Sequence, residues 1–220
     1  PVLAVGVTAI ALGPIASYNL GERGLVLTIT FAFIASALVF MLSDGVQSGP
    51  LPNMAMTNLG VMYLGVLGSF GGLVLAGGGY YRNVGTDTMF ILVVGVVASD
   101  VAGLFVGQAM GRTPLRGWIS PGKTVEGLLG GVLASIVAVS IIALKNDTWN
   151  GKGNVLLLGL GIGIFAPLGD LTESMFKRNL DIKDFGTLIK GHGGVLDRFD
   201  GFLFALPFTY YTLILLQPWS

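Results

Sequence analysis

Cysteine is absent from the 220-residue sequence, which excludes disulfides and thiolate metal sites. Charged side chains are also scarce. They make up 11% of the residues, against about 25% in typical soluble domains. The formal net charge of zero indicates no particular partner, and we expect no nucleic-acid partner. The excess lies in apolar residues, at 53% of the chain, and in glycine, with 35 residues.

Long stretches of the chain contain no charged side chain. They are residues 1–21, 24–43, 45–81, 127–144, 153–169 and 201–220. A transmembrane helix needs about 20 mostly apolar residues. The stretches are too numerous for a signal peptide followed by a soluble domain. They are also continuously apolar, which argues against the alternating strands of an outer-membrane barrel. The sequence therefore predicts an all-α, polytopic transmembrane helix bundle.

Turn-forming residues divide the chain into about seven helices. The expected helices are 1–20, 24–43, 55–76, 88–110, 124–144, 154–177 and 200–218. We expect 1–87 to hold N-terminal transmembrane helices and 88–220 to form a catalytic region with loops 111–123 and 178–199. The chain opens inside an apolar segment. We therefore expect that N-terminal residues are missing from it.

The loops between the helices differ in positive charge. Eight Lys and Arg residues lie in or beside the loops on one side, and four lie on the other. The positive-inside rule places the richer side, which includes both 111–123 and 178–199, in the cytoplasm.

Glycines recur at four-residue spacing in three of the predicted helices, which allows helix backbones to approach closely in lipid. They are Gly103, Gly107 and Gly111, then Gly127 and Gly131, then Gly159 and Gly163. We expect packing within the bundle, and a homodimer interface is the alternative.

Of the 24 charged residues, 11 lie between Asp170 and Asp200. Asp170 and Glu173 are three residues apart and so share a helix face, and Asp197 and Asp200 adjoin the last helix. Asp100 lies in the middle of another predicted helix. Ionisable groups in membrane segments usually mark a functional site, although each acid could simply pair with a nearby Lys or Arg.

Carboxylates that converge on one point repel each other unless a cation lies between them. Oxygen ligands, with no cysteine and one histidine, favour Mg²⁺ over zinc. A Mg²⁺ ion held by few carboxylates leaves positions for phosphate oxygens, as in enzymes of phosphoryl or nucleotidyl transfer.

Basic residues flank these acids and could either bind substrate phosphates or anchor anionic lipid headgroups. They are Lys177, Arg178, Lys183 and Arg198. Gly193 and Gly194 follow His192 and favour a loop whose backbone N–H groups approach a phosphate. We expect His192 to contact a phosphate or donate a proton rather than bind a metal.

Residues 117–124 match the P-loop pattern G-x-x-x-x-G-K-[ST], but they lie between two predicted membrane helices, which argues against a P-loop fold. We expect Ser120 to be the N-cap and Pro121 the first residue of the next helix, whose first turn would attract an anion together with Lys123. Glu126 could bind the metal, hold Lys123 or contact a ribose.

Residues 174–200 resemble the C-terminal signature of the phosphatidate cytidylyltransferases (CDP-diacylglycerol synthases). The signature runs S-x-apolar-K-R, four residues, K-D, a glycine-bearing stretch, then H-G-G-apolar-x-D-R-apolar-D. The chain fits it in length and at nearly every specified position, with Lys190 where the pattern has Pro or Gly. Residues 100–107, 111–112 and 119–127 are also similar to the family.

The resemblance implies transfer of CMP from CTP to phosphatidic acid in phospholipid biosynthesis, at the cytoplasmic face of the inner (plasma) membrane. It implies Mg²⁺ held by Asp170, Asp197 and Asp200, with K⁺ as a candidate second ion. Lys177 is a further catalytic candidate. The substrate-binding candidates are Asp100, Ser120, Lys123, Thr124, Glu126, Ser174, Arg178, Lys183, His192, Gly193, Gly194 and Arg198.

Two other functions are compatible with parts of the pattern. A CTP-dependent polyprenol or phytol kinase has related basic and acidic motifs, but it would release CDP instead of pyrophosphate. A cation-coupled transporter would explain acids inside helices. A transporter has no evident use for the eleven charges of 170–200.

Overall fold

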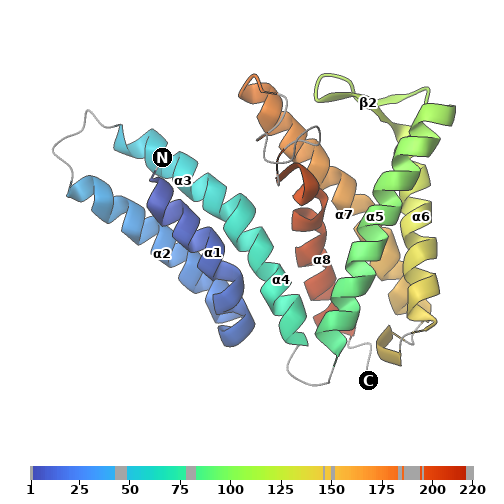
Figure 1. Ribbon diagram of the computed structural model, residues 1–220, viewed down its shortest axis with the longest axis horizontal. Coiled ribbons are helices and arrows are strands. Elements are labelled where there is room, and N and C mark those ends of the chain that lie inside the picture. The colour runs from blue at the N-terminus through green and yellow to red at the C-terminus, as the bar shows by residue number, and fades with distance from the viewer. Residues whose placement is uncertain are drawn as a thin grey trace. The chain divides into compact units, whose positions relative to one another are not determined.

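The computed structural model describes residues 2–42, 49–77, 83–145, 147–149, 152–182, 185, 194 and 196–216. The chain splits into two compact units, Pro1–Gly85 and Thr86–Ser220. Among the described residues, helices account for nearly all of the regular structure, and a single short hairpin is the exception (Figure 1). The prediction of an all-α helix bundle is confirmed.

The first unit contains a helical hairpin and one long composite helix. Its elements are α1 (Leu3–Leu20), α2 (Glu22–Met41), α3 (Pro50–Gly60), the π-helical η2 (Val61–Val66) and α4 (Leu67–Ala76). Gly21 joins α1 to α2 with a φ of 63°, a value that glycine adopts without strain. α3, η2 and α4 follow one another without a break, and α1 packs against both α2 and α4.

Small residues line the buried faces of the first two helices. In α1 the buried positions are Val5, Ala9, Gly13 and Ser17, and in α2 they are Gly24, Thr28, Ala32 and Ser36. Both sets follow a four-residue spacing, which places them in one stripe along each helix. Thr28 donates its hydroxyl to the carbonyl of Gly24 at 2.8 Å. The two helices therefore meet through small side chains, as is typical of helices in lipid.

In the second unit, the described residues form three long helices, one shorter helix and the hairpin. Its elements are α5 (Val84–Met110), β1 (Pro114–Arg116), β2 (Ser120–Thr124), α6 (Val125–Ala143), the 3₁₀ turn η4 (Asp147–Trp149), α7 (Lys152–Asn179), the 3₁₀ turn η5 (Leu196–Arg198) and α8 (Asp200–Leu216). α7 packs along both α6 and α8 (Figure 1). The hairpin, the end of α7 and the start of α8 lie at the same end of this unit (Figure 1).

The glycines that the sequence singled out make these helix contacts. A β-carbon at Gly127 would lie 2.7 Å from the carbonyl oxygen of Gly103, so α5 and α6 approach closely there. A β-carbon at Gly163 would lie 2.8 Å from the Cα atom of Val132, so α6 and α7 do the same. The glycine spacing thus serves packing within the chain, as expected, and the homodimer stays a prediction.

The start of α6 differs from the prediction. Ser120 was expected to cap this helix and Pro121 to begin it, but Ser120–Thr124 is a strand paired with β1, and α6 begins at Val125. Thr124 is the N-cap, and its hydroxyl accepts the N–H of Gly127 at 3.1 Å. The pairing of the hairpin therefore prevails over the Ser-Pro signal, and the cap moves to the last residue of the strand.

At the opposite end of this unit, η4 fastens the connection between α6 and α7 to α5. The indole N–H of Trp149 donates to the hydroxyl of Thr88 at 3.0 Å, and Trp149 is buried. Thr148 donates its hydroxyl to the carboxylate of Asp87 at 2.7 Å. A buried indole needs a hydrogen-bond acceptor, and α5 supplies it.

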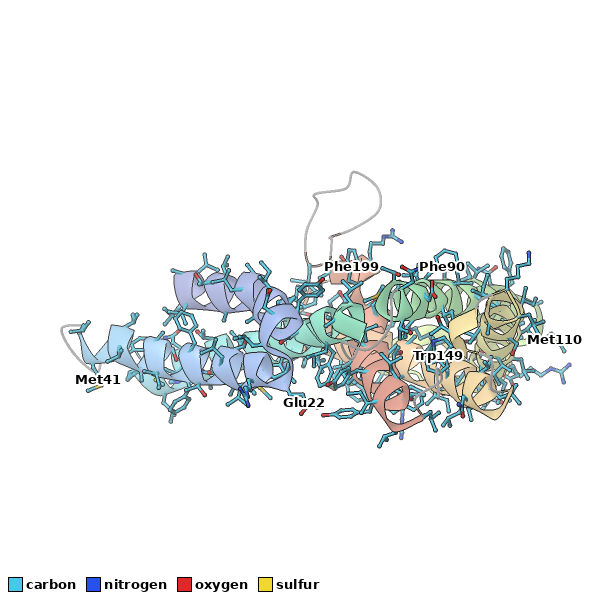
Figure 2. All side chains as sticks on the ribbon, turned by 90° about the horizontal axis from the view of Figure 1, so that it is seen from below. Glu22, Met41, Phe90, Met110, Trp149 and Phe199 are labelled. Carbon is cyan, nitrogen blue, oxygen red and sulfur yellow. The ribbon has the colours of Figure 1, made fainter. Side chains whose placement is uncertain are left out.

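Large apolar side chains cover the outside of the helices, as Figure 2 shows around Phe90 and Met110. Within the described residues, six helices are long and apolar enough to cross a membrane, and α8 is a shorter apolar helix. Small residues at the helix contacts and large apolar residues on the outside are the arrangement that lipid favours. The chain is therefore a multi-pass membrane protein.

We predict that Gly163→Ala destabilises the protein, because its β-carbon would meet the backbone of α6. Overpacking of this kind costs about 1–3 kcal/mol, so the midpoint of thermal unfolding in detergent should fall by about 2–10 °C. Gly60→Ala is the matched control, because nothing lies within 4 Å of a β-carbon there. Equal midpoints for the two variants would contradict the tight α6–α7 contact.

Candidate active site

The last turns of α7 carry the polar side chains of the candidate site. Asp170, Glu173, Ser174 and Lys177 follow three- and four-residue spacing and so share one face of the helix. Asp200 opens α8 beside this face. Gly169 permits the approach, because a β-carbon there would lie 3.0 Å from the carbonyl carbon of Asp200 and closer still to its oxygen.

Three carboxylates meet where α7 and α8 approach. One oxygen each from Asp170, Glu173 and Asp200 lies within 4.8 Å of the others. The Glu173 side chain is fully buried, and its Oε1 atom has no hydrogen-bond partner among the described residues. A buried carboxylate oxygen without a partner is costly, so this atom is suited to coordinate a cation.

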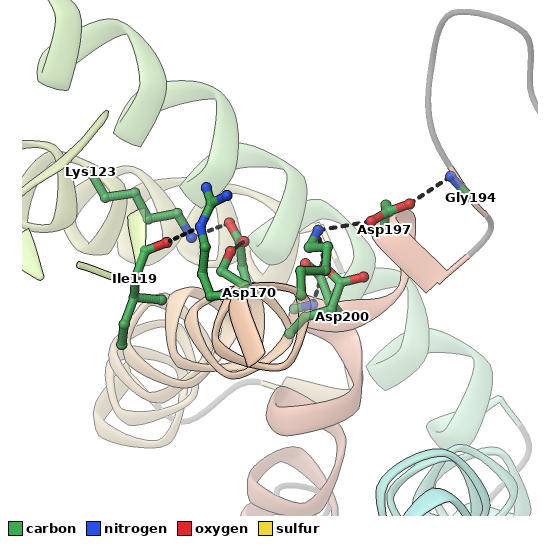
Figure 3. A network of polar contacts seen from close by, with 11 residues as sticks. Ile119, Lys123, Asp170, Gly194, Asp197 and Asp200 are labelled. Carbon is green, nitrogen blue, oxygen red and sulfur yellow. Dashed lines mark hydrogen bonds and ion pairs between the residues drawn. The ribbon is translucent and has the colours of Figure 1, made fainter. Parts of the chain in front are cut away.

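Two lysines, one from β2 and one from α7, approach the carboxylates. Lys123 of β2 forms an ion pair with Asp170 (Figure 3). Lys177 donates to Glu173 at 3.0 Å and to Asp197 at 2.8 Å. Lys177 therefore links the buried end of α7 to η5, the turn that precedes α8.

Asp197 is held from both sides. One of its oxygens accepts from Lys177, and the other accepts the backbone N–H of Gly194 at 2.6 Å. Burial by itself would raise the pKa of the Asp197 carboxyl, but the hydrogen bonds from Lys177 and Gly194 outweigh burial, so the pKa lies below its usual value. Asp197 thus stays ionised and keeps η5 against α7.

The β1–β2 hairpin is attached to the bundle at its tip and at its base. At the tip, Nε of Arg178 donates to the carbonyl of Ile119 at 3.1 Å (Figure 3). At the base, the carboxylate of Glu126 accepts the backbone N–H groups of Arg112 and Thr113 at 3.1 and 3.2 Å. One predicted role of Glu126 was to hold Lys123. This prediction is wrong, because Lys123 pairs with Asp170 instead.

Two further candidates lie beside the carboxylates. Asp100 of α5 is close enough to interact electrostatically with Asp170 and Asp200. Ser174 donates its hydroxyl to Asp170 at 3.4 Å, a long hydrogen bond.

The remaining sequence candidates lie in η5 or outside the described part of the chain. Arg198 lies in η5. The candidates Lys183, His192 and Gly193 lie outside the described residues.

Glu173 belongs to the carboxylate group, although the sequence did not single it out as a metal or substrate ligand. The sequence placed it on the same helix face as Asp170, and that spacing was the available signal. The full burial of Glu173 could not be predicted from the sequence, because burial depends on the contacts of α7 with its neighbours.

A family comparison agrees with this geometry. The model of the Cytidylyltransferase family matches residues 2–216. The chain belongs to this family.

Curated relatives in this family carry a more specific name. A phosphatidate cytidylyltransferase of Bacillus subtilis is 42% identical over 131 residues, which cover 60% of this chain and 49% of the relative. That of Synechocystis is 49% identical over 123 residues, covering 55% and 41%, and that of Haemophilus influenzae is 43% identical over 127 residues, covering 56% and 43%. The matched part spans about half the length of these cytidylyltransferases or somewhat less.

We predict that Lys177→Met destabilises the protein, because the buried Glu173 would lose its ion pair. Breaking one side of a buried pair costs about 3–5 kcal/mol in the free energy of unfolding. The double variant Glu173→Gln/Lys177→Met should regain part of the loss, because it carries no unpaired charge at position 173. The check is the thermal unfolding midpoint of each variant in detergent. If the single and double variants were equally destabilised, Lys177 would act through packing rather than charge.

Proposed function

We propose that the protein transfers CMP from CTP to phosphatidic acid, which yields CDP-diacylglycerol and pyrophosphate. The observation that carries this proposal is the group of three carboxylates at the α7–α8 contact with two lysines paired to it. Membership in the Cytidylyltransferase family and relatives named phosphatidate cytidylyltransferase support the same reaction.

The acids around the site outnumber the lysines paired with them, so the excess negative charge favours a divalent cation. Five acids gather here, Asp197 and Asp100 included, while Lys123 and Lys177 are the lysines paired with them among the described residues. Carboxylate oxygens are the ligands that Mg²⁺ prefers. The donor set fits Mg²⁺, and so does the Oε1 atom of Glu173, which has no hydrogen-bond partner in the described part of the chain.

We assign Asp170, Glu173 and Asp200 to hold this ion. When bound, Mg²⁺ would neutralise charge on the triphosphate and on the departing pyrophosphate. Asp197 was a sequence candidate for the same role, but both of its oxygens are engaged by Lys177 and Gly194. We therefore propose that Asp197 positions Lys177. A second ion such as K⁺ stays a prediction.

The reaction needs little covalent chemistry from the protein. A phosphate oxygen of phosphatidic acid attacks the α-phosphorus of CTP in line, and a new P–O bond forms. The bond from the α-phosphorus to the bridging oxygen breaks, and its electron pair leaves with pyrophosphate. The attacking oxygen is already anionic, so no general base is required. Lys177 and Lys123 stand beside the carboxylates, where they can orient the two polyanions.

The proposed site faces the cytoplasm, where CTP is found, on the inner (plasma) membrane. It lies at the hairpin end of the second unit, which carries Arg116, Lys123 and Arg178 among the described residues. The phosphate of a membrane lipid lies at the same depth as such loops. Within the described residues, no contact specifically favours the polyprenol kinase or the transporter.

We predict that the purified protein releases pyrophosphate only when CTP, Mg²⁺ and phosphatidic acid are all supplied. Asp200→Asn should lower the rate about 100-fold or more, because it removes one charged ligand of the ion. Asp181→Asn is the matched control, because Asp181 is exposed on the loop after α7 and outside the carboxylate group.

Other results would redirect the assignment. Release of CDP in place of pyrophosphate would identify a kinase. Cation flux in proteoliposomes without CTP consumption would identify a transporter. Equal rates for Asp200→Asn and Asp181→Asn would separate the reaction from the carboxylate group.

We predict that Mg²⁺ raises the thermal unfolding midpoint of the wild-type protein, because a ligand of the folded state stabilises it by about 2.7 kcal/mol at 100 times its Kd. Glu173→Gln should reduce this shift, while Asp181→Asn should keep it. The measurement needs no turnover. A shift of the same size in all three proteins would place the ion elsewhere.

A further inference from the structure

We propose that a pocket on the flank of α7 holds one acyl chain of phosphatidic acid, with Arg116 at its rim contacting the lipid phosphate. This inference rests on the proposed function and adds where the lipid substrate binds. The pocket has a volume of about 300 Å³ and lies between β1, α6 and α7. Its lining residues are Leu115, Arg116, Leu128, Ile164, Pro167, Leu168 and Leu171.

The pocket and the carboxylate group share α7 but occupy different faces of it. Ile164, Leu168 and Leu171 are spaced by four and three residues, so they form one stripe. Asp170 and Glu173 form a neighbouring stripe, and Leu171 directly follows Asp170 in the chain. The pocket therefore ends within about one helical turn, or 5.4 Å of rise, of the carboxylates.

The hairpin spans both faces. Lys123 of β2 pairs with Asp170 on the carboxylate side, while Leu115 and Arg116 of β1 line the pocket. The contact between Arg178 and Ile119 fixes the tip of the hairpin to α7. A lipid held in the pocket would thus have its headgroup beside β1. The strand paired with β1 is β2, whose Lys123 reaches the carboxylates.

The pocket wall faces the bilayer. Ile164 and Leu168 are 40% and 42% exposed, and both lie in a helix long and apolar enough to span a membrane. Six of the seven lining residues are apolar, so an uncharged chain can enter sideways without desolvating a polar group. The volume is at the small end of ligand pockets, about 300–1,000 Å³, which suits part of one acyl chain and not a whole lipid.

Arg116 favours phosphatidic acid over other membrane lipids. It is the single charged residue of the lining, its side chain is exposed, and no ion pair is formed by it among the described residues. A guanidinium binds a phosphate by charge-assisted hydrogen bonds, often through two donors. The terminal phosphate of phosphatidic acid is accessible to such a contact, whereas the headgroup of phosphatidylcholine covers its phosphate with a cation.

Filling the pocket tests the acyl-chain site. Leu128→Trp places a large ring in the lining, and Leu129→Trp is the matched control, because Leu129 is exposed on the same helix and does not line the pocket. We expect Leu128→Trp to raise the KM for dioleoyl phosphatidic acid about tenfold, the result of losing about two buried methylene groups. The KM for CTP should stay unchanged.

A binding measurement keeps this proposal separate from the reaction. Native mass spectrometry of the full chain, loaded from equal mixtures of dioleoyl phosphatidic acid and phosphatidylcholine, gives the ratio of the two lipids retained. Arg116→Gln should lower that ratio about tenfold, while Arg112→Gln, an exposed arginine outside the pocket, should leave it unchanged. Both substitutions are at exposed positions, so this arm does not depend on repacking.

The outcomes distinguish the two proposals. Selective retention that depends on Leu128 and Arg116, without any CTP turnover, would support the lipid site and overturn the proposed reaction. Normal turnover with the same KM in Leu128→Trp and Leu129→Trp would overturn the lipid site and leave the reaction standing. An equal rise of the KM for CTP would also overturn it, because the effect would not be confined to the lipid. Equal ratios for Arg116→Gln and Arg112→Gln would overturn the phosphate contact.

Discussion

The contact of Lys177 with two carboxylates is the interaction on which the candidate site depends. Its ammonium group joins Glu173, which is fully buried in α7, to Asp197 in the turn before α8. Without this cation, Glu173 would be an uncompensated buried charge, which costs several kcal/mol. The same ammonium group holds η5, the turn that directly precedes Asp200 at the start of α8. The lysine that compensates the charge of Glu173 therefore also fixes the geometry of the site.

Close helix packing makes that contact possible. Gly169 allows the backbone of Asp200 to lie against α7, and Gly163 allows α7 to lie against α6. In lipid, helices gain little from burying large apolar side chains, since the surroundings are equally apolar. Small residues and a few polar bonds hold the helices instead, and they bring acids from α7 and α8 within 4.8 Å. The large side chains left outside form the lipid-facing surface, including the wall of the pocket beside α7.

Much of the fold could be predicted from the sequence, because a span of about 20 residues without charge has few alternatives to a transmembrane helix. The helix ends were less predictable, since a local Ser-Pro signal competed with a strand pairing that involves residues 114–116. Among the site residues, the shared face of Asp170 and Glu173 followed from their spacing. The partner of Asp197 did not, because Lys177 lies 20 residues away along the chain.

The sequence by itself determined the class of protein, the positions of its spans and the segment in which its charges gather. Each of these follows from composition and from periodicity along one helix, which are local properties. Only the tertiary structure decided that Glu173 lies beside Asp170 and Asp200. It also decided that Asp197 accepts hydrogen bonds from Lys177 and Gly194. Finally, it placed β1 where it lines a pocket beside α7. These depend on which helices approach closely, and that choice is made by contacts between residues distant in the chain.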